Sequence, residues 1–244
     1  MLKDKVVIVT GSSGLIGSSI VDEIIRNNGI PICADIKPPK GGAKDFFYCD
    51  ITDQASIVKV VGDVLAKYGK IDGLVNNAYP RTSDWGCDFE DVSEKSLKQN
   101  IDWQLTSCIL LCQRVISEYM GANGGAIVNI ASIYGMVGND FTIYEGTGVT
   151  PPAAYTAIKG GMINFTRYLA SRYGMNGVRV NCVSPGGIKN NQPDSFIRAY
   201  ESKVPMKRMG NPEDISPPVV FLLSNGAQYI TGQNLAVDGG WTSI

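Results

Sequence analysis

The sequence predicts an α/β protein with a doubly wound parallel sheet and helices on both of its faces. Three observations lead to this fold class. Short apolar, β-branched segments alternate with helix-patterned segments along the chain, a glycine-rich turn follows the first of them, and no repeat, low-complexity tract or linker divides the 244 residues. Apolar strands alternating with helices are typical of a parallel sheet covered on both faces. We therefore expect one domain over residues 1–244.

The order of elements follows from composition and periodicity. Segments with the character of strands are Lys5–Thr10, Pro31–Asp35, Phe46–Cys49, Gly73–Asn76, Ala126–Ala131, Arg179–Ser184 and Asn234–Val237. Helical spacing of apolar residues covers Leu15–Asn28 and the ranges 53–68, 94–120, 155–173 and 213–224. Two long stretches, Tyr79–Asp91 and Ile133–Ala154, fit no regular element. Loops of this length in a compact domain are typical of functional sites.

Composition excludes several kinds of partner. Lys and Arg number 22 against 23 Asp and Glu, so the net charge is −1 and no basic cluster indicates a nucleic-acid or membrane surface. The six cysteines form no Cys-x-x-Cys pair, which favours reduced structural thiols. The apolar run after Lys5 is too short for a secretion signal or a spanning helix. We expect a cytoplasmic protein that binds neither nucleic acid nor membrane.

The absence of histidine restricts the chemistry more than any other feature of composition. Without an imidazole there is no Ser-His-Asp or Cys-His nucleophile, no histidine metal ligand and no histidine acid/base. We expect no metal site, and any proton transfer must use another side chain.

A glycine-rich turn joins the first predicted strand to the first predicted helix. Gly11 permits a tight turn, Gly14 lets the backbone approach a pyrophosphate, and Gly17 allows close packing of the helix, whose N-terminus adds N–H donors. The alternative is a plain glycine turn, but strand, helix and a downstream acid all lie where a dinucleotide site needs them. The predicted contacts in this turn are Gly11, Ser13, Gly14, Leu15, Ile16 and Gly17.

The downstream acid is Asp35, which ends the second strand 18 positions after Gly17. A carboxylate at this place accepts ribose hydroxyls and repels a 2′-phosphate, which favours NAD over NADP. Lys37 and Lys40 weaken this preference. Residues after the next strands extend the predicted site, although Asp and Asn are also common in turns: these are Asp50 and Ile51 beside the adenine, and Asn77 and Ala78 in the cofactor groove.

Tyr155 and Lys159 are four positions apart, so on a helix they share one face. A neighbouring ammonium, helped by a cationic nicotinamide, favours the tyrosine phenolate, so lysine substitutes for the missing histidine. Ser132 follows a strand and is placed to donate a hydrogen bond to a substrate oxygen. Taken alone, Tyr-x-x-x-Lys is equally a surface pair on a helix.

Motifs along the whole chain resemble the single-domain branch of the short-chain dehydrogenase/reductase family. They are TGSSGLIG, NNA, IAS, YTAIK, NCVSPG, PMKRMGNPEDI and ITGQNLAVDGGW, in the family's order. The resemblance implies a Rossmann-type fold with about seven strands. It also implies Tyr155 as acid/base, Lys159 holding the nicotinamide ribose and lowering the pKa of Tyr155, and Ser132 polarising the substrate oxygen. Pro185, Gly186 and Ile188 are then expected beside the nicotinamide.

Among the chain's departures from the family pattern, two bear on the proton relay and on the shape of the active site. The family's proton-relay asparagine falls on Gln104, with Asn100 one helical turn earlier as the other candidate. Ser132 and Tyr155 stand 23 positions apart, a longer interval than is usual in the family, so a loop inserted over about 133–154 must arch beside the active site.

This loop, together with Ala78-Tyr79-Pro80-Arg81, resembles a bacterial subgroup linked to flagellin modification and acidic-sugar biosynthesis. Arg81, Tyr134 and Tyr144 are therefore candidate substrate residues, because aromatic faces pack on sugar rings and arginine pairs with phosphate. The alternative is that these three side chains only hold the loop together.

The resulting hypothesis is an NAD(H)-dependent oxidoreductase acting on a carbonyl or secondary alcohol, with a sugar or sugar phosphate as the small-molecule substrate. The alternatives are a non-catalytic NAD-binding regulatory protein and a reductase of a non-sugar ketone such as a 3-oxoacyl thioester. A sugar-nucleotide epimerase is disfavoured by the short chain and the glycine spacing. By resemblance, we expect a homo-oligomer, a dimer or a tetramer, assembled through the long helices at 94–120 and 155–173 and the C-terminal segment.

Overall fold

A parallel sheet forms the centre of the molecule in the computed structural model, which describes residues 1–39 and 45–244. Within these residues the sheet has seven strands in the order β3-β2-β1-β4-β5-β6-β7. The strands are β1 (Val6–Thr10), β2 (Ile30–Asp35), β3 (Phe46–Tyr48), β4 (Gly73–Asn76), β5 (Gly125–Ile130), β6 (Val178–Pro185) and β7 (Asn234–Val237). Every pair of neighbours is parallel, so the predicted fold class is confirmed.

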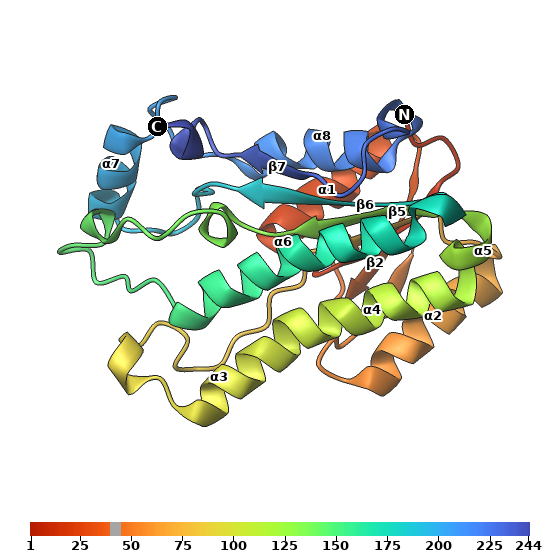
Figure 1. The fold of residues 1–244 in the computed structure, drawn as a ribbon, viewed down its shortest axis with the longest axis horizontal. Helices are drawn as coiled ribbons and strands as arrows, with labels where there is room; N and C mark the ends of the chain where they lie inside the picture. Colours follow the sequence, from red (N-terminus) through yellow and green to blue (C-terminus); the bar gives the residue numbers. More distant parts are fainter. Residues whose placement is uncertain (40–44) are drawn as a thin grey trace.

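Helices cover both faces of the sheet, as Figure 1 shows. One face carries α1 (Leu15–Arg26) and α8 (Pro212–Leu223), and the other carries α2 (Gln54–Tyr68), α4 (Ser107–Val115) and α6 (Ala153–Tyr173). Alternate residues of β1 enter the two cores: Val7 and Val9 pack with α1 and α8, while Ile8 packs on the opposite side. This two-sided burial explains why the strands read as continuous apolar runs.

The helix predicted over 94–120 is present but not uniform. It consists of α3 (Glu94–Ile101), α4 and the short α5 (Gly121–Asn123), joined by π-helical turns at Asp102–Thr106 and Ile116–Met120. A π turn inserts an extra residue and is frequent at functional sites. The first of these turns contains Gln104.

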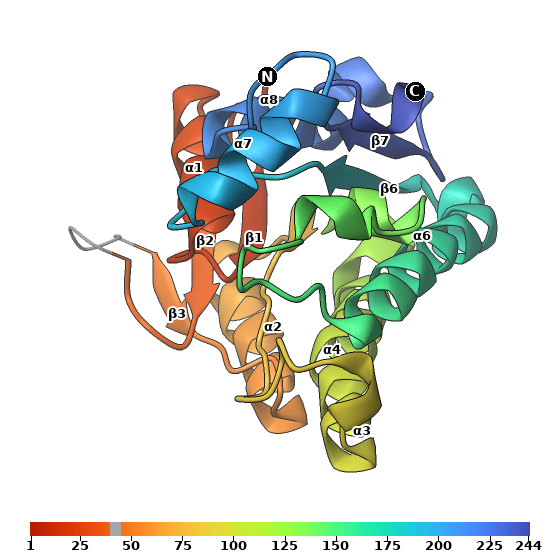
Figure 2. The same cartoon turned by 90° about the vertical axis from the view of Figure 1, so that its left-hand side faces the viewer.

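The sequence pattern did not predict the helix α7 (Asp194–Lys203). Only Phe196 and Tyr200 of its ten residues are buried, so the apolar stripe is too narrow to recognise from periodicity. The stripe packs on Ile143 of the inserted loop and on the partly buried Trp241 near the C-terminus. Figure 2 shows α7 beside this loop at one end of the molecule.

The sheet order places a crevice at the carboxyl ends of the central strands. β1 pairs with β2 on one side and with β4 on the other, so the chain leaves these strands toward opposite faces. Ligands of open α/β sheets bind at such a switch point. In the described part of the chain no helix combines the length and apolar character needed to cross a membrane.

Candidate active site

The glycine-rich turn has the tight geometry that its sequence predicts. Gly11 adopts a left-handed φ of +63°, and the Gly14 amide donates to the Gly11 carbonyl oxygen over 3.1 Å. A Cβ atom on Gly17 would lie 2.0 Å from that carbonyl oxygen, so the first turn of α1 can approach the loop only with glycine there.

Thr10 and Asn77 fasten this turn to the end of β4. The Thr10 hydroxyl accepts from the amides of Asn77 and Ala78 over 3.0 and 3.1 Å. The Asn77 side-chain amide donates to the carbonyl oxygens of Thr10 and Gly11, over 3.0 and 3.1 Å. Thr10 was not among the predicted site residues. The pattern that could have identified it is a polar residue at the end of an otherwise apolar strand. In the folded chain Thr10 is 2% exposed.

Asp35 closes the crevice on the β2 side. Its carboxylate accepts hydrogen bonds from the amides of Ser13, over 2.9 Å, and Lys37, over 3.1 Å. The acid therefore holds the glycine turn and is also one of the residues that line the crevice. Lys40, which the sequence analysis placed near this acid, lies outside the described residues.

These elements surround a cleft of about 790 Å³. Except for Gly17, which packs behind the turn, every predicted cofactor residue lines it: Gly11, Ser13, Gly14, Leu15, Ile16, Asp35, Asp50, Ile51, Asn77, Ala78, Tyr155, Lys159, Pro185, Gly186 and Ile188. Arg81 lines the same cleft, whereas Ser132, Gln104, Tyr134 and Tyr144 do not. The folded chain thus gathers residues from both of its halves around one cavity.

Lys159 enters the cleft from α6 and is 6% exposed. Its Nζ donates to the carbonyl oxygen of Ile130 over 2.7 Å. Burial lowers the pKa of Lys159 to about 8, against the raising influence of Cys108 and Cys182. This amine therefore titrates close to physiological pH.

Tyr155 lies on the same helix, and burial raises the pKa of its hydroxyl. A hydrogen bond with Ser132 acts in the opposite direction, and Tyr144 adds to the rise. Burial therefore outweighs the stabilising contacts on the phenolate in this arrangement. The lowering of the Tyr155 pKa by Lys159, implied by the family resemblance, stays a prediction.

Aromatic rings from the Tyr79–Asp91 stretch pack against Tyr155. The ring centroid of Tyr79 lies 5.6 Å from that of Tyr155 and 5.7 Å from that of Trp85, each in an edge-to-face arrangement. Trp85 and Tyr155 are 6.3 Å apart in the same manner. The Arg81 guanidinium lies 5.4 Å from the Tyr79 ring centroid. Sequence periodicity gave no signal for Trp85, because its contact is with a distant part of the chain.

The two relay candidates have different surroundings. Asn100 is fully engaged, because its amide contacts Ser96 and the Thr82 hydroxyl and its oxygen accepts from the Thr82 amide. Gln104 donates to the carbonyl oxygen of Pro80 over 2.8 Å, but its buried Oε1 has no partner among the described residues. Gln104 also borders a cavity of about 10 Å³ beside Thr10 and Cys108.

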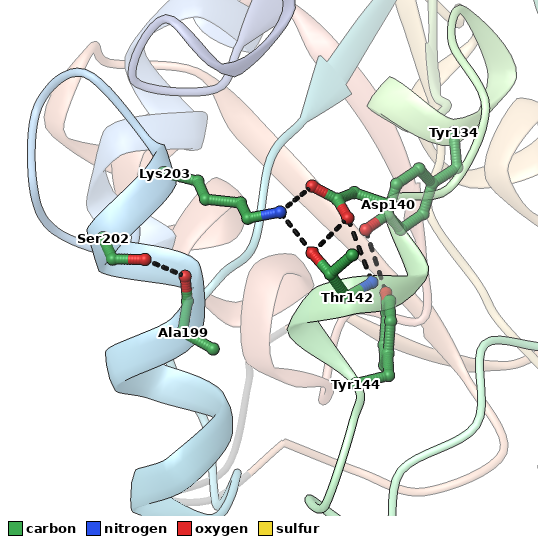
Figure 3. A network of polar contacts seen from close by, with 7 residues as sticks. All are labelled: Tyr134, Asp140, Thr142, Tyr144, Ala199, Ser202 and Lys203. Carbon is green, nitrogen blue, oxygen red and sulfur yellow. Dashed lines mark hydrogen bonds and ion pairs between the residues drawn. The ribbon is translucent and has the colours of Figure 1, made fainter.

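The inserted loop is fastened to α7, as Figure 3 shows. Lys203 of α7 pairs with the Asp140 carboxylate and contacts the Thr142 hydroxyl. Within the loop, the Tyr144 hydroxyl donates to the Tyr134 hydroxyl over 2.9 Å. Both phenols thus hold the loop together in this structure, which is the alternative that the sequence left open. Their contact with substrate stays a prediction.

Comparison with known proteins identifies the family. A family model described as enoyl-(acyl carrier protein) reductase matches residues 34–242. The crystal structure of a short-chain dehydrogenase from Leptospira borgpetersenii serovar Hardjo-bovis with bound NAD+ superposes with a TM-score of 0.91. It is 36% identical in sequence, and the match covers 99% of this chain and 94% of that chain. The chain belongs to the short-chain dehydrogenase/reductase family.

Two curated relatives add detail. The chain is 33% identical over 254 residues to post-translational flagellin modification protein A of Campylobacter coli, covering 99% of both chains. It is also 33% identical over 256 residues to the 3-oxoacyl-[acyl-carrier-protein] reductase FabG of Chlamydia muridarum, covering 98% of both. As a short-chain dehydrogenase/reductase, the protein is an oxidoreductase that uses NAD or NADP and acts on small molecules. The predicted enzyme class is confirmed.

Proposed function

We propose that the cleft binds NAD(H) and that Ser132, Tyr155 and Lys159 carry the proton chemistry on a carbonyl or secondary alcohol. The observation that carries this proposal is the shared cavity: Tyr155 and Lys159 line the same cleft as the glycine turn and Asp35. The close approach at Gly17, where a Cβ would meet the Gly11 carbonyl, supports a cradle for a pyrophosphate.

The cofactor preference rests on Asp35. Asp35 lines the cleft at the end of β2, where a carboxylate would accept ribose hydroxyls and repel a 2′-phosphate. The amides of the glycine turn and the N-terminus of α1 would hold the pyrophosphate, and Pro185, Gly186 and Ile188 of the cleft lining would hold the nicotinamide. When bound, the nicotinamide supplies a hydride donor or acceptor.

The protein's own residues then handle the substrate oxygen. The Tyr155 hydroxyl gives or takes the proton on that oxygen, and the Ser132 hydroxyl donates a hydrogen bond to it as charge develops. The Lys159 ammonium favours the Tyr155 phenolate by its positive charge and donates to the ribose. Carbonyl and alcohol are thus interconverted without histidine.

Gln104 is the proposed relay residue. Its Oε1 is a buried acceptor without a partner in the described chain, beside a cavity at the lower size limit for one water molecule. The side-chain oxygen of Asn100, by contrast, already accepts a hydrogen bond from the Thr82 amide, and its Nδ2 donates to the Thr82 hydroxyl. We propose that a water molecule bound to Gln104 passes protons between the interior and the Tyr155–Lys159 pair.

For the substrate we propose a sugar or sugar phosphate. Arg81 lines the cleft and forms no ion pair with an acidic side chain of the described residues, so its charge is available for a phosphate or carboxylate. Tyr79 and Trp85 supply aromatic surfaces beside Tyr155. The similarity to a flagellin modification protein favours this class. The similarity to FabG favours a 3-oxoacyl thioester as the second candidate.

The proposal is tested by titrating NADH and NADPH into the protein while following nicotinamide fluorescence. We expect tighter binding of NADH, followed by oxidation with a keto sugar or keto-sugar phosphate from a panel. Oxidation only by a 3-oxoacyl thioester would move the assignment to the second candidate. Failure of both dinucleotides to bind would contradict the assignment of the cleft.

We further propose that residues 1–244 act as one domain in a cytoplasmic homo-oligomer, a dimer or a tetramer. On α6, Tyr168 stacks on Phe165 with centroids 6.2 Å apart and is 61% exposed, which suits a contact between subunits. Analytical ultracentrifugation of the protein and of Tyr168→Glu measures this, and we expect the variant to be the smaller species.

A further inference from the structure

Tyr79 stands where the cofactor cleft meets the proposed catalytic residues. It is the first residue after Asn77-Ala78 at the end of β4, and its side chain lines the cleft. Its ring forms edge-to-face pairs with Tyr155, at an interplanar angle of 74°, and with Trp85, at 83°. Such perpendicular pairs are the favoured geometry of aromatic contacts, because the positive edge of one ring meets the negative face of another.

Two cations also face the Tyr79 ring. The Nζ atom of Lys159 lies 5.6 Å from its centroid, and the Arg81 guanidinium lies 5.4 Å away. Lys159 has no carboxylate within ion-pair distance among the described residues. Its positive charge is instead stabilised by the Ile130 carbonyl oxygen and by two aromatic rings. The second ring is that of Tyr155, whose centroid is also 5.6 Å from Nζ. Cation–π attraction is strongest where water is excluded.

We propose that Tyr79 is a positioning residue whose aromatic ring holds the Lys159 ammonium and the Tyr155 ring in their working arrangement. This inference rests on the proposed function of Tyr155 and Lys159. It assigns the role to the ring and not to the hydroxyl. Burial, and then the charge of a Tyr155 phenolate, raise the pKa of Tyr79, so Tyr79 stays a neutral ring at physiological pH.

The two cysteine thiols that face Lys159 stay uncharged over the pH range of a test. Cys108 of α4 and Cys182 of β6 face it, together with Tyr155 and Tyr79. A hydrogen bond with Cys112 and burial raise the pKa of Cys108, and burial raises the pKa of Cys182 to about 12. A change of NADH affinity near pH 8 that depends on Lys159 therefore does not come from either thiol.

The test measures NADH affinity from about pH 6 to about pH 10 for wild type, Tyr79→Leu and Tyr79→Phe. Tyr229→Leu is the matched control, because Tyr229 is fully exposed and borders a different pocket from the cleft. In wild type we expect affinity to fall above about pH 8 as Lys159 loses its proton. In Tyr79→Leu this fall should begin about one pH unit lower, because the cation–π contact is lost. Tyr79→Phe and Tyr229→Leu should keep the wild-type profile.

Lys159→Met separates this inference from the proposed function. If the fall near pH 8 persists in Lys159→Met, the proposed role of Lys159 in dinucleotide binding is wrong. If it vanishes in Lys159→Met but keeps its wild-type pH in Tyr79→Leu, the role of Tyr79 is overturned. A Tyr79→Phe profile that follows Tyr79→Leu would also overturn it, because the effect on Lys159 would then depend on the Tyr79 hydroxyl and not on its ring.

A crystal structure of Tyr79→Leu decides the question independently of any pH profile. We expect Lys159 Nζ to move away from the Ile130 carbonyl and the Tyr155 ring to change its tilt against Trp85. Unchanged positions of all three side chains would overturn the positioning role. A thermal melt of each variant shows whether the chain is folded before these measurements are compared.

Discussion

The Lys159 ammonium donates a 2.7 Å hydrogen bond to the carbonyl oxygen of Ile130, the last residue of β5. This contact ties α6 to the strand that leads into Ser132, so the three proposed catalytic residues share one scaffold. It also keeps an amine inside the protein, where burial lowers the pKa of Lys159 to about 8. The buried amine is placed for the proposed proton chemistry, but its burial lowers the free energy of unfolding.

Lys159→Met should therefore stabilise the protein at neutral pH. The folded-state pKa of about 8 lies below the ordinary 10.5, so the unfolded chain binds more protons between these values and stability rises with pH across that window. Below pH 8 the burial cost is fully present, of order 3 kcal/mol at most. Urea unfolding of both proteins at pH 7 and at about pH 10 measures this. A wild-type protein as stable as the variant at pH 7 contradicts the prediction.

Tyr155→Phe should lose about a hundredfold or more in turnover, because a general acid/base is removed. NADH affinity should stay nearly unchanged, since the ring and its edge-to-face contacts with Tyr79 and Trp85 remain. Steady-state kinetics and fluorescence titration of the same preparation give both values. Wild-type turnover in the variant would rule out the assigned role.

Asp35→Ala should weaken NADH binding more than NADPH binding, because the carboxylate that repels a 2′-phosphate is lost. Both affinities should also fall somewhat, since Asp35 holds the Ser13 amide of the glycine turn. Asp35→Asn is the matched control that keeps an acceptor for this amide without the charge. Titrations that show an equal loss for both cofactors in both variants would exclude the ribose assignment.

Lys203→Met should impair substrate binding while NADH affinity changes little. The variant removes the ion pair with Asp140 that fastens the inserted loop to α7, and neither residue lines the dinucleotide cleft. We expect KM to rise severalfold. Lys207→Met is the control, because among the described residues the Lys207 amine hydrogen-bonds a backbone carbonyl of α7 and no acidic side chain. Shortening residues 138–150 should act in the same direction and more strongly. An equal loss of NADH affinity would show that the loop supports the whole fold.

Gly17→Ala should abolish NADH binding or prevent folding, because its Cβ would lie 2.0 Å from the Gly11 carbonyl oxygen. Gly62→Ala offers a matched comparison in α2, where no described atom outside the neighbouring helix backbone lies within 4 Å of an added Cβ. This second variant should be more stable by about 0.5–1 kcal/mol, because alanine favours the helix. Thermal melts with and without NADH measure both effects, and a Gly17→Ala protein with normal affinity would contradict the close approach.

The features that the sequence predicts best are those set by local pattern. The strand periodicity, the glycine turn and the position of Asp35 each depend on neighbouring residues, and the parallel sheet follows from their order. The lining of the cleft by Tyr155 and Lys159 follows from helical spacing once α6 is placed.

Other features depend on contacts between distant segments and could not be predicted. Trp85 has no distinctive pattern in its own stretch, and its position beside the proposed active site follows from packing on Tyr155, which is distant in sequence, as well as on Tyr79. For Tyr134 and Tyr144 the sequence left two interpretations open, substrate contact or support of the loop, and only the folded chain shows that their hydroxyls bond each other across the inserted loop. α7 has too few apolar residues to be detected without the loop against which it packs.

The parallel order of the sheet also has a consequence for biosynthesis. β1 must pair with β4, through Val7 and Gly73, and the cleft takes residues from Gly11 to Gln192. A nascent chain emerging from the ribosome therefore has no dinucleotide site until β6 and the segment beyond it have been made. Over most of its synthesis the polypeptide must rely on partial sheets with open edges, without help from a bound ligand.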